Sequence, residues 1–206
     1  MDRLLGITST LRGENGCPWD RKQTLHSLKH CLVEETYEVI DAIDSGNRDL
    51  HAEELGDVLL LLVLQAQIRK EAGDFDFNDV INRLCEKLTR RHPHVFGNVK
   101  VSKPEEALRT WEGEKAKEKK AERKSVLDGV PRALPSLERA SKLQTKASRV
   151  GFDWTKAKEV IVKIEEELSE TRKAMSRGRK KEIKEELGDL LFAVTNLCRF
   201  LGVRAE

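Results

Sequence analysis

The chain has 206 residues, and its 38 Lys and Arg residues against 36 Asp and Glu residues give a formal net charge of +2. A hydrophobic fraction of 38% and a charged fraction of 36% exclude disorder along the whole length and indicate a folded protein with strongly hydrated surfaces. The near balance of charges argues against binding to duplex DNA through the overall field, so we expect no stable nucleic-acid binding.

Membrane and secretory classes are not expected either. The longest apolar run, residues 58–64, is far shorter than the roughly 20 residues that a membrane span needs. The first residues show no apolar stretch followed by a small-residue cleavage site, so the sequence predicts a cytoplasmic protein. The four cysteines are scattered without Cys-x-x-Cys spacing, which is typical of free thiols in a reducing compartment.

Helical periodicity dominates the chain, and no alternating apolar and polar run is bounded by hairpin turns, so we predict an all-α protein. Asp20 and Gln23 have the spacing of a capping box, which predicts a helix from about residue 21 that ends at residues 45–47, Ser-Gly-Asn. The next helix is predicted over residues 49–72. It is apolar on every side over residues 58–64, which predicts burial at the centre of a bundle or in a subunit interface.

Further helices and one linker complete the expected organisation. One helix is predicted to end at about Arg91, and a capping box of Ser102 and Glu105 opens a charged helix through residue 124. Two prolines and an Asp-Gly pair make residues 125–136 the best linker in the chain. The expected organisation is a first module over residues 1–124, the linker 125–136, and a second module over residues 137–206.

The two modules share an internal repeat. The pattern Glu-Glu-x-x-Glu occurs at residues 34–38 and again at 166–170, and Glu-Glu-Leu-Gly-Asp occurs at 53–57 and 185–189, so both patterns recur at the same offset along the chain. Two unrelated helices would not coincide in this way. The sequence therefore predicts two copies of a helix-loop-helix unit that presents acidic residues from both of its helices.

The spacing of these acidic residues favours a divalent metal. Glu35 and Glu38, like Glu54 and Asp57, are three residues apart and share one face of a helix, and a short turn makes the two helices antiparallel neighbours. Four clustered carboxylates repel one another unless a cation compensates them. Oxygen ligands without His or Cys favour Mg²⁺, with Mn²⁺ as a substitute, over iron. The second copy carries the same predicted ligand set, Glu167, Glu170, Glu186 and Asp189.

Several motifs together closely resemble the MazG family of nucleoside triphosphate pyrophosphohydrolases. The resemblance covers essentially the whole chain and is carried by the two acidic units and by residues 17–20 (Cys-Pro-Trp-Asp), 23–24 (Gln-Thr), 65–68 (Gln-Ala-Gln-Ile), 90–96 (Arg-Arg-His-Pro-His-Val-Phe), 111–112 (Trp-Glu), 129–135 and 150–154 (Val-Gly-Phe-Asp-Trp). It implies helical bundles of the all-α NTP pyrophosphatase type in two tandem modules. It also implies a homodimer that hydrolyses nucleoside triphosphates, NTP and dNTP, to the monophosphate and pyrophosphate.

The resemblance also implies roles for single residues. Glu35, Glu38, Glu54 and Asp57 are expected to bind Mg²⁺, and Glu34 is expected to support the attacking water. Arg90 and Arg91 are the expected partners of the departing pyrophosphate, because guanidinium groups pair with phosphate oxygens and stay charged; a basic cap at the helix end is the alternative. We also consider Trp19 as a base-stacking residue and Lys115 as a phosphate contact, although packing and solvation, respectively, are the ordinary roles of such residues.

The two copies differ after their acidic units. The first copy is followed by its basic element, Arg90 and Arg91, whereas the sequence ends at Glu206, before the corresponding position after Asp189 is reached. We therefore interpret the second module as incomplete at its C-terminal end. The expectation is that it binds metal but hydrolyses poorly unless a partner chain supplies cations, and that the first module carries the turnover.

Two other functions fit the same residues less well. One is a non-catalytic helical protein whose acidic clusters bind a structural metal or a basic partner. The other is a pyrophosphohydrolase specific for one nucleotide, such as phosphoribosyl-ATP, dUTP or dCTP. Downstream arginines that complete a phosphate site favour a hydrolase, and the two-copy architecture favours the general enzyme that removes aberrant or excess nucleotides.

Overall fold

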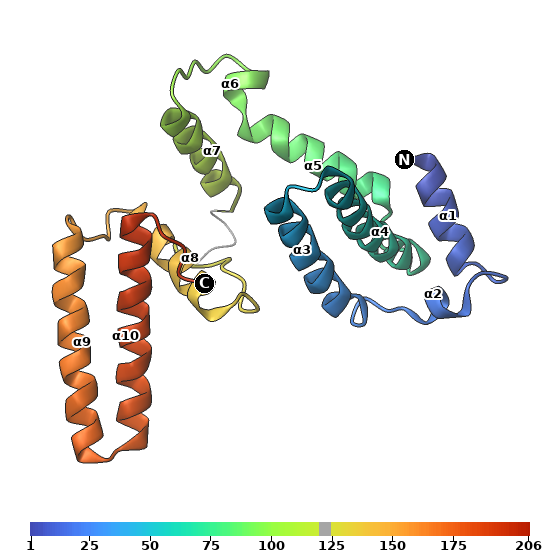
Figure 1. The fold of residues 1–206 in the computed structure, drawn as a ribbon. Helices are drawn as coiled ribbons and strands as arrows, with labels where there is room; N and C mark the ends of the chain where they lie inside the picture. Colours follow the sequence, from blue (N-terminus) through green and yellow to red (C-terminus); the bar gives the residue numbers. More distant parts are fainter. Residues whose placement is uncertain (120–124) are drawn as a thin grey trace. The chain divides into compact units, whose positions relative to one another are not determined.

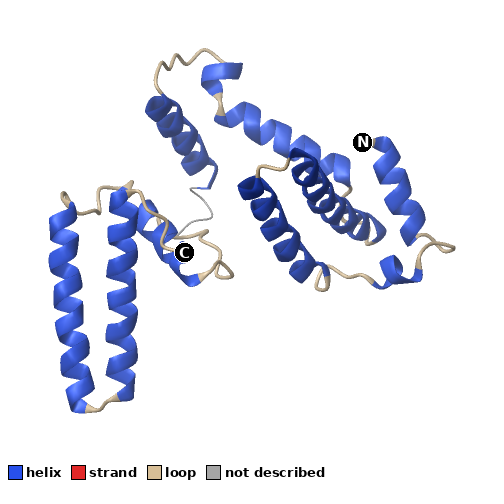
Figure 2. Ribbon diagram, in the orientation of Figure 1, coloured by secondary structure: helices blue, strands red, loops and turns tan. Residues whose placement is uncertain are grey.

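The computed structural model describes residues 1–119 and 125–206, and the described part is helical without any strand. The chain divides into two compact units, Met1–Lys115 and Ala116–Glu206. Helices connected by loops make up both units (Figures 1 and 2), which confirms the predicted all-α class. The helices are α1 (Asp2–Arg12), α2 (Pro18–Lys22), α3 (Leu28–Ser45), α4 (Arg48–Glu71), α5 (Phe77–Arg91), α6 (Pro93–Phe96), α7 (Pro104–Lys119), α8 (Ser136–Ser148), α9 (Ala157–Arg177) and α10 (Lys180–Leu201).

Each unit contains one helical hairpin, α3–α4 in the first and α9–α10 in the second, and both hairpins turn at the same position of the repeat. Gly46 and Gly178 occupy this position and adopt φ values of 68° and 67°, a left-handed conformation that glycine tolerates without a steric penalty. In the first hairpin the side chain of Asn47 then accepts hydrogen bonds from the backbone N–H groups of Asp49 and Leu50. The helices of each hairpin run antiparallel side by side (Figure 1), so the predicted repeat is a structural repeat.

The core of the first unit lies between α3 and α4. Leu28, Leu61 and Leu64 are its buried centre, and partly buried residues of the same two helices pack around them. Helix α1 packs on α4, where Arg12 forms an ion pair of 2.7 Å with Glu71 and also donates to the backbone carbonyls of Asp20 and Gln23. Arg12 therefore ties α1 and the α2 segment to the end of α4.

The predicted start of the first hairpin near residue 21 is wrong. Pro18–Lys22 forms the separate short helix α2, with Cys17 as its N-cap and Gln23 as its C-cap, and α3 begins at Leu28. Thr24 and Ser27 set this start, because each side-chain oxygen accepts a hydrogen bond from the other residue's backbone N–H, at 3.1 and 3.0 Å. A reciprocal pair of short hydroxyl side chains thus replaces the expected Asp20–Gln23 box.

Residues 58–64, predicted to be buried in a bundle or in a subunit interface, are only partly buried within the single chain, and the interface stays a prediction. Leu61, Val63 and Leu64 are buried, but Leu62 of the same run is 44% exposed, because α3 and α1 cover only part of the surface of α4. The second unit leaves the equivalent position, Val194, 41% exposed. An apolar face of each hairpin is therefore uncovered in the single chain.

The remaining boundaries follow local capping. Helix α4 runs over Arg48–Glu71, close to the predicted 49–72, and α5 ends at Arg91 as predicted. At the start of α7 the backbone N–H of Ser102 donates to Glu106 at 3.0 Å, so the capping carboxylate is one residue beyond the expected Glu105. Residues 120–124, the end of the predicted charged helix, lie outside the described residues.

The second unit packs α8 against the α9–α10 hairpin. The amide nitrogen of Gln144 in α8 donates a hydrogen bond of 2.7 Å to the backbone carbonyl of Phe192 in α10. Val160 and Ala174 of α9 and Thr195 of α10 are nearly inaccessible to solvent and form the hairpin core. Within the described part of the chain, no helix is long and apolar enough to cross a membrane.

Candidate functional site

The first hairpin gathers three carboxylates into one cluster. Glu35 and Glu38 come from α3 and Glu54 comes from α4, and each offers an oxygen within 4.8 Å of the others. Glu35 and Glu54 are partly buried, and Glu38 is exposed. The antiparallel hairpin therefore brings residues from two different helices to one point, as the spacing predicts.

The electrostatics of this cluster show how unfavourable it is without a cation. Burial, together with the charges of Glu38 and Asp57, raises the pKa of both Glu35 and Glu54 above the ordinary value of a glutamate. Asp57, the fourth predicted ligand, is thus close enough to act on the cluster although it is not one of the three residues whose oxygens converge. The carboxylates repel one another, and a positive ion between them would relieve the repulsion.

The second hairpin repeats the arrangement with Glu167 from α9 and with Glu186 and Asp189 from α10. Glu167 is buried, with only 6% of its surface exposed. Burial raises the pKa of Glu186, and the neighbouring charges of Glu170, Glu167 and Asp189 raise it further. Glu170, the fourth predicted ligand here, acts on the cluster through its charge in the same way as Asp57 acts on the first.

A lysine distinguishes the second cluster from the first. Lys163 of α9 forms ion pairs of 2.7 Å with Glu167 and 3.0 Å with Glu166, and these carboxylates raise the pKa of the ammonium group well above its ordinary value. The equivalent residue of the first copy is Cys31, whose thiol donates to the backbone carbonyl of Ser27. The sequence analysis missed Lys163; its position four residues before Glu167, one helical turn away, is the signal that could have identified it.

The donor sets of both clusters fit a hard divalent cation. Every converging ligand atom is a carboxylate oxygen, and no His or Cys belongs to either group. Such oxygens are the ligands that Mg²⁺ and Mn²⁺ prefer, whereas zinc and copper sites need imidazole or thiolate. Burial and mutual repulsion raise the pKa values of Glu35, Glu54 and Glu186, and a bound cation would relieve that repulsion.

The predicted basic residues gather at a different point of the first unit. Arg91 at the end of α5 is buried, and its guanidinium lies 5.3 Å from the centre of the Trp111 ring in α7. The ammonium of Lys115 lies 4.6 Å from the same ring. Trp111, which the sequence analysis noted only within a motif, therefore joins the two predicted cations, while Arg90 is exposed at the end of α5.

Two predicted site residues are exposed. Trp19, on the short helix α2, has 73% of its surface accessible, so it is no packing anchor within the described chain. Glu34 is exposed on α3, immediately before Glu35. Both are open to a ligand, and their expected roles remain predictions.

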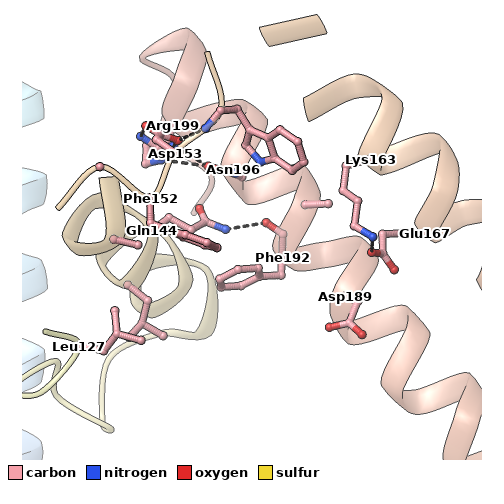
Figure 3. Close-up of a pocket in the computed structure, with 15 residues that line it drawn as sticks. Leu127, Gln144, Phe152, Asp153, Lys163, Glu167, Asp189, Phe192, Asn196 and Arg199 are labelled. Carbon is pink, nitrogen blue, oxygen red and sulfur yellow. Dashed lines mark hydrogen bonds and ion pairs between the residues drawn. The ribbon is translucent and has the colours of Figure 1, made fainter. Parts of the chain in front are cut away.

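A cavity of about 680 Å³ opens beside the second cluster. Lys163, Glu167 and Asp189 form one side, and α8, α10 and the loop before α9 form the rest (Figure 3). Its aromatic lining residues are Phe152, Trp154 and Phe192. The size and the mixture of apolar walls with a few charged groups are typical of a site for a small organic ligand. Only the motif at residues 150–154 gave any signal for this cavity in the sequence.

The fold and the two clusters define an all-α protein with a group of converging carboxylates in each of its two helical hairpins. The sequence model of the MazG nucleotide pyrophosphohydrolase domain matches residues 23–96, and that of phosphoribosyl-ATP pyrophosphohydrolase matches residues 134–206. The chain is 48% identical to the nucleoside triphosphate pyrophosphohydrolase/pyrophosphatase MazG of Thermotoga maritima, over 100% of this chain and 78% of that protein. It is 46% identical to the nucleoside triphosphate pyrophosphohydrolase of Escherichia coli K12, over 100% of this chain and 80% of that protein.

A solved structure also aligns with part of the chain. The crystal structure of a mazG-related protein from Thermotoga maritima covers 56% of this chain and 98% of its own length, at 32% identity and a TM-score of 0.48. The relatives that match over the full chain establish the family. The chain belongs to the MazG family of nucleotide pyrophosphohydrolases.

Proposed function

We propose that this chain is a cytoplasmic, Mg²⁺-dependent hydrolase that converts NTPs and dNTPs to the nucleoside monophosphate and pyrophosphate and so removes aberrant or excess nucleotides. The observation that carries the proposal is the repeated convergence of three carboxylate oxygens within 4.8 Å, in a chain of the MazG family. A single acidic cluster is common on protein surfaces. Each copy of the structural repeat has such a cluster, and the equivalent pairs Glu35 with Glu54 and Glu167 with Glu186 belong to both, which indicates a shared chemical role.

Glu35, Glu38, Glu54 and Asp57 would hold Mg²⁺ in the first module, and Glu167, Glu170, Glu186 and Asp189 would hold it in the second. The bound ion would supply charge neutralisation for the phosphates and a lowered pKa for a coordinated water. Mn²⁺ would serve in its place because it accepts the same oxygen ligands.

Other side chains of the first module would act on the substrate itself. Glu34, exposed beside Glu35, would accept a hydrogen bond from the attacking water and orient it toward the α-phosphorus. Arg90, Arg91 and Lys115 would neutralise the departing pyrophosphate, since the ring of Trp111 already holds Arg91 and Lys115 close together. Trp19 would stack on the base from its exposed position.

The assignment of turnover to one module is a separate proposal. From the sequence we expect the first module to carry it, because that module contains the basic residues Arg90 and Arg91 after its acidic unit. The structure supplies an observation that favours the second module, since the cavity of about 680 Å³ lies directly beside its carboxylates and Lys163. Paired substitutions in the two clusters decide between the modules.

We also propose that the active form is a homodimer. The exposed apolar positions Leu55 and Leu62 in the first hairpin recur at the same places of the repeat as Leu187 and Val194 in the second. A helix pair that leaves the same apolar face uncovered twice is half of a four-helix bundle, and a second copy would complete it.

One alternative substrate has specific support. The match of residues 134–206 to phosphoribosyl-ATP pyrophosphohydrolase favours phosphoribosyl-ATP as a candidate substrate for the second module. This compound carries the same triphosphate group, so the same carboxylates would serve. It therefore belongs in the substrate panel beside the standard nucleotides, dUTP and dCTP.

The test is product analysis on this panel, with and without Mg²⁺, by ion-exchange separation of pyrophosphate from orthophosphate. We expect metal-dependent formation of monophosphate and pyrophosphate, and we expect Glu54→Gln to lower the rate at least tenfold while Glu186→Gln retains most of it. The reverse ranking would move the turnover to the second module. Absence of turnover for every nucleotide, in protein that is folded and binds Mg²⁺, would leave the non-catalytic binding protein as the better interpretation.

A further inference from the structure

The cavity of the second unit contains a polar group that the proposed chemistry does not use. Gln144 of α8 lines the cavity and is buried, with only 6% of its surface exposed. Its side-chain oxygen Oε1 has no hydrogen-bond partner among the described residues and no contact with solvent. A buried acceptor without a partner costs stability, and a ligand that provides a donor would remove this cost.

The orientation of this amide is determined by the backbone. Its nitrogen Nε2 donates to the carbonyl of Phe192 at 2.7 Å, as Figure 3 shows. Reversing the amide would set its oxygen against the carbonyl oxygen of Phe192, which is repulsive. The nitrogen therefore already donates a hydrogen bond, and the group of Gln144 that lacks a partner is its acceptor oxygen Oε1.

The rest of the cavity has the features that a nucleotide needs. Lys163 provides a cation beside Glu167 and Asp189 (Figure 3), and the aromatic rings of Phe152, Trp154 and Phe192 provide flat apolar surface in the same lining. Phe152 is 81% exposed, so few contacts hold its ring in place beside the cavity that it lines together with Gln144.

We propose that Gln144 is a specificity-determining residue that accepts a hydrogen bond from the exocyclic amino group of a nucleobase bound in this cavity. This inference rests on the proposed nucleotide hydrolase and names its preferred substrate class. Adenine and cytosine present an N–H donor where hypoxanthine and uracil present a carbonyl oxygen. An acceptor whose only partner is the ligand favours the amino bases, because the carbonyl analogue leaves Gln144 unpaired and repels it.

The experiment compares matched pairs of nucleotides that differ at this group, CTP with UTP and ATP with ITP. The wild-type chain is expected to prefer the amino member of each pair by about tenfold in kcat/KM, the selectivity that one unpaired buried group produces. Gln144→Met keeps the length of the side chain and removes the acceptor, so the ratio is expected to fall toward one. The matched control is Lys142→Met, an exposed position on the same helix, which is expected to leave the ratio unchanged.

The ratio separates recognition from folding. Gln144→Met also loses the hydrogen bond to Phe192, and any loss of folded protein lowers the rates for both members of a pair equally. Binding of CMP and UMP to the wild-type chain, measured by calorimetry without Mg²⁺, is a second readout that needs no hydrolysis. Tighter binding of CMP supports the inference even if the protein turns over no nucleotide. Equal binding of CMP and UMP, or a CTP/UTP ratio that Gln144→Met leaves unchanged while hydrolysis proceeds, would overturn it.

Discussion

Lys163 is the residue at which the two acidic clusters differ most in charge. Its ammonium nitrogen lies 2.7 Å from a carboxylate oxygen of Glu167 and neutralises that charge. Glu167 is buried, so little solvent screens the ion pair. The first cluster has the uncharged Cys31 at this position of the repeat. The second site therefore holds a cation of its own even without a metal, although this lysine is not the counterpart of Arg90 and Arg91.

Lys163→Met is expected to change metal and nucleotide binding in opposite directions. Removal of the ammonium leaves Glu166 and Glu167 without their ion-pair partner, so Mg²⁺ should bind the second cluster roughly two- to fivefold more tightly, the effect of one partly exposed ion pair. The nucleotide should bind more weakly, because its phosphates lose a cation. Calorimetric titration with Mg²⁺ and then with a nucleotide measures both effects.

Lys173→Met, at an exposed position on the same helix, is the control and should change neither affinity by as much. A Lys163→Met protein that binds both ligands more weakly would contradict the role given to this lysine.

At the scale of helices, each hairpin holds two sets of like charges together. The apolar contacts between α3 and α4 bring Glu35 and Glu54 close, and the hairpin α9–α10 does the same for Glu167 and Glu186. This proximity is unfavourable, because burial and the neighbouring negative charges raise the pKa values of Glu35, Glu54 and Glu186. The packing of each helix pair therefore works against its electrostatics, and a cation removes the conflict.

The pH dependence of metal stabilisation follows from these shifts. A group whose pKa is higher in the folded state contributes stability at low pH and loses it as the pH rises through the folded pKa. Mg²⁺ needs the ionised carboxylates, so its addition should raise the Tm more at pH 7.5, where the clusters are ionised and repel, than at pH 5, where they are closer to protonation. Differential scanning calorimetry at both pH values, with NaCl at matched ionic strength, measures this.

The variant Glu35→Gln/Glu54→Gln tests the origin of the effect, because it lowers the charge of the first cluster and should reduce the pH dependence. An equal rise in Tm at the two pH values, or a larger rise at pH 5, would show that the clusters are not the site of stabilisation.

At the scale of the whole molecule, the uncovered apolar faces are the basis of the proposed homodimer. Leu62 of α4 and Leu191 of α10 are 44% and 58% exposed, although both lie in the most apolar parts of their helices. Exposed leucines in the apolar stretch of a helix are candidates for an interaction surface, here one in each unit.

We expect Leu62→Glu/Leu191→Glu to convert the proposed homodimer to a monomer, because each charge would be buried at the interface without a partner but stays in solvent in the single chain. Light scattering coupled to size-exclusion chromatography gives the mass. The control Lys70→Glu/Lys184→Glu places the same charges on the same helices at exposed polar positions and should remain dimeric. A wild-type chain that elutes as a monomer at all concentrations would rule out the proposal.

Much of this architecture could be predicted because it depends on local rules. The ends of α3 and α4 follow from Gly46 and Asn47, and the convergence of Glu35, Glu38 and Glu54 follows from helical spacing and a short turn. The failures are also local in origin. Capping can be provided by several neighbouring residues, so Thr24 and Ser27, rather than Asp20 and Gln23, determine the start of α3.

The sequence by itself determined the helical class, the repeat and the carboxylate chemistry of both hairpins, because periodicity, turn residues and ligand type act over a few positions of the chain. Only the tertiary structure decided which groups meet across long separations. Gln144 of α8 reaches Phe192 of α10, Lys163 faces a cavity rather than open solvent, and Arg91 lies against Trp111. These contacts depend on how helices pack in three dimensions, and no spacing within a single helix encodes that packing.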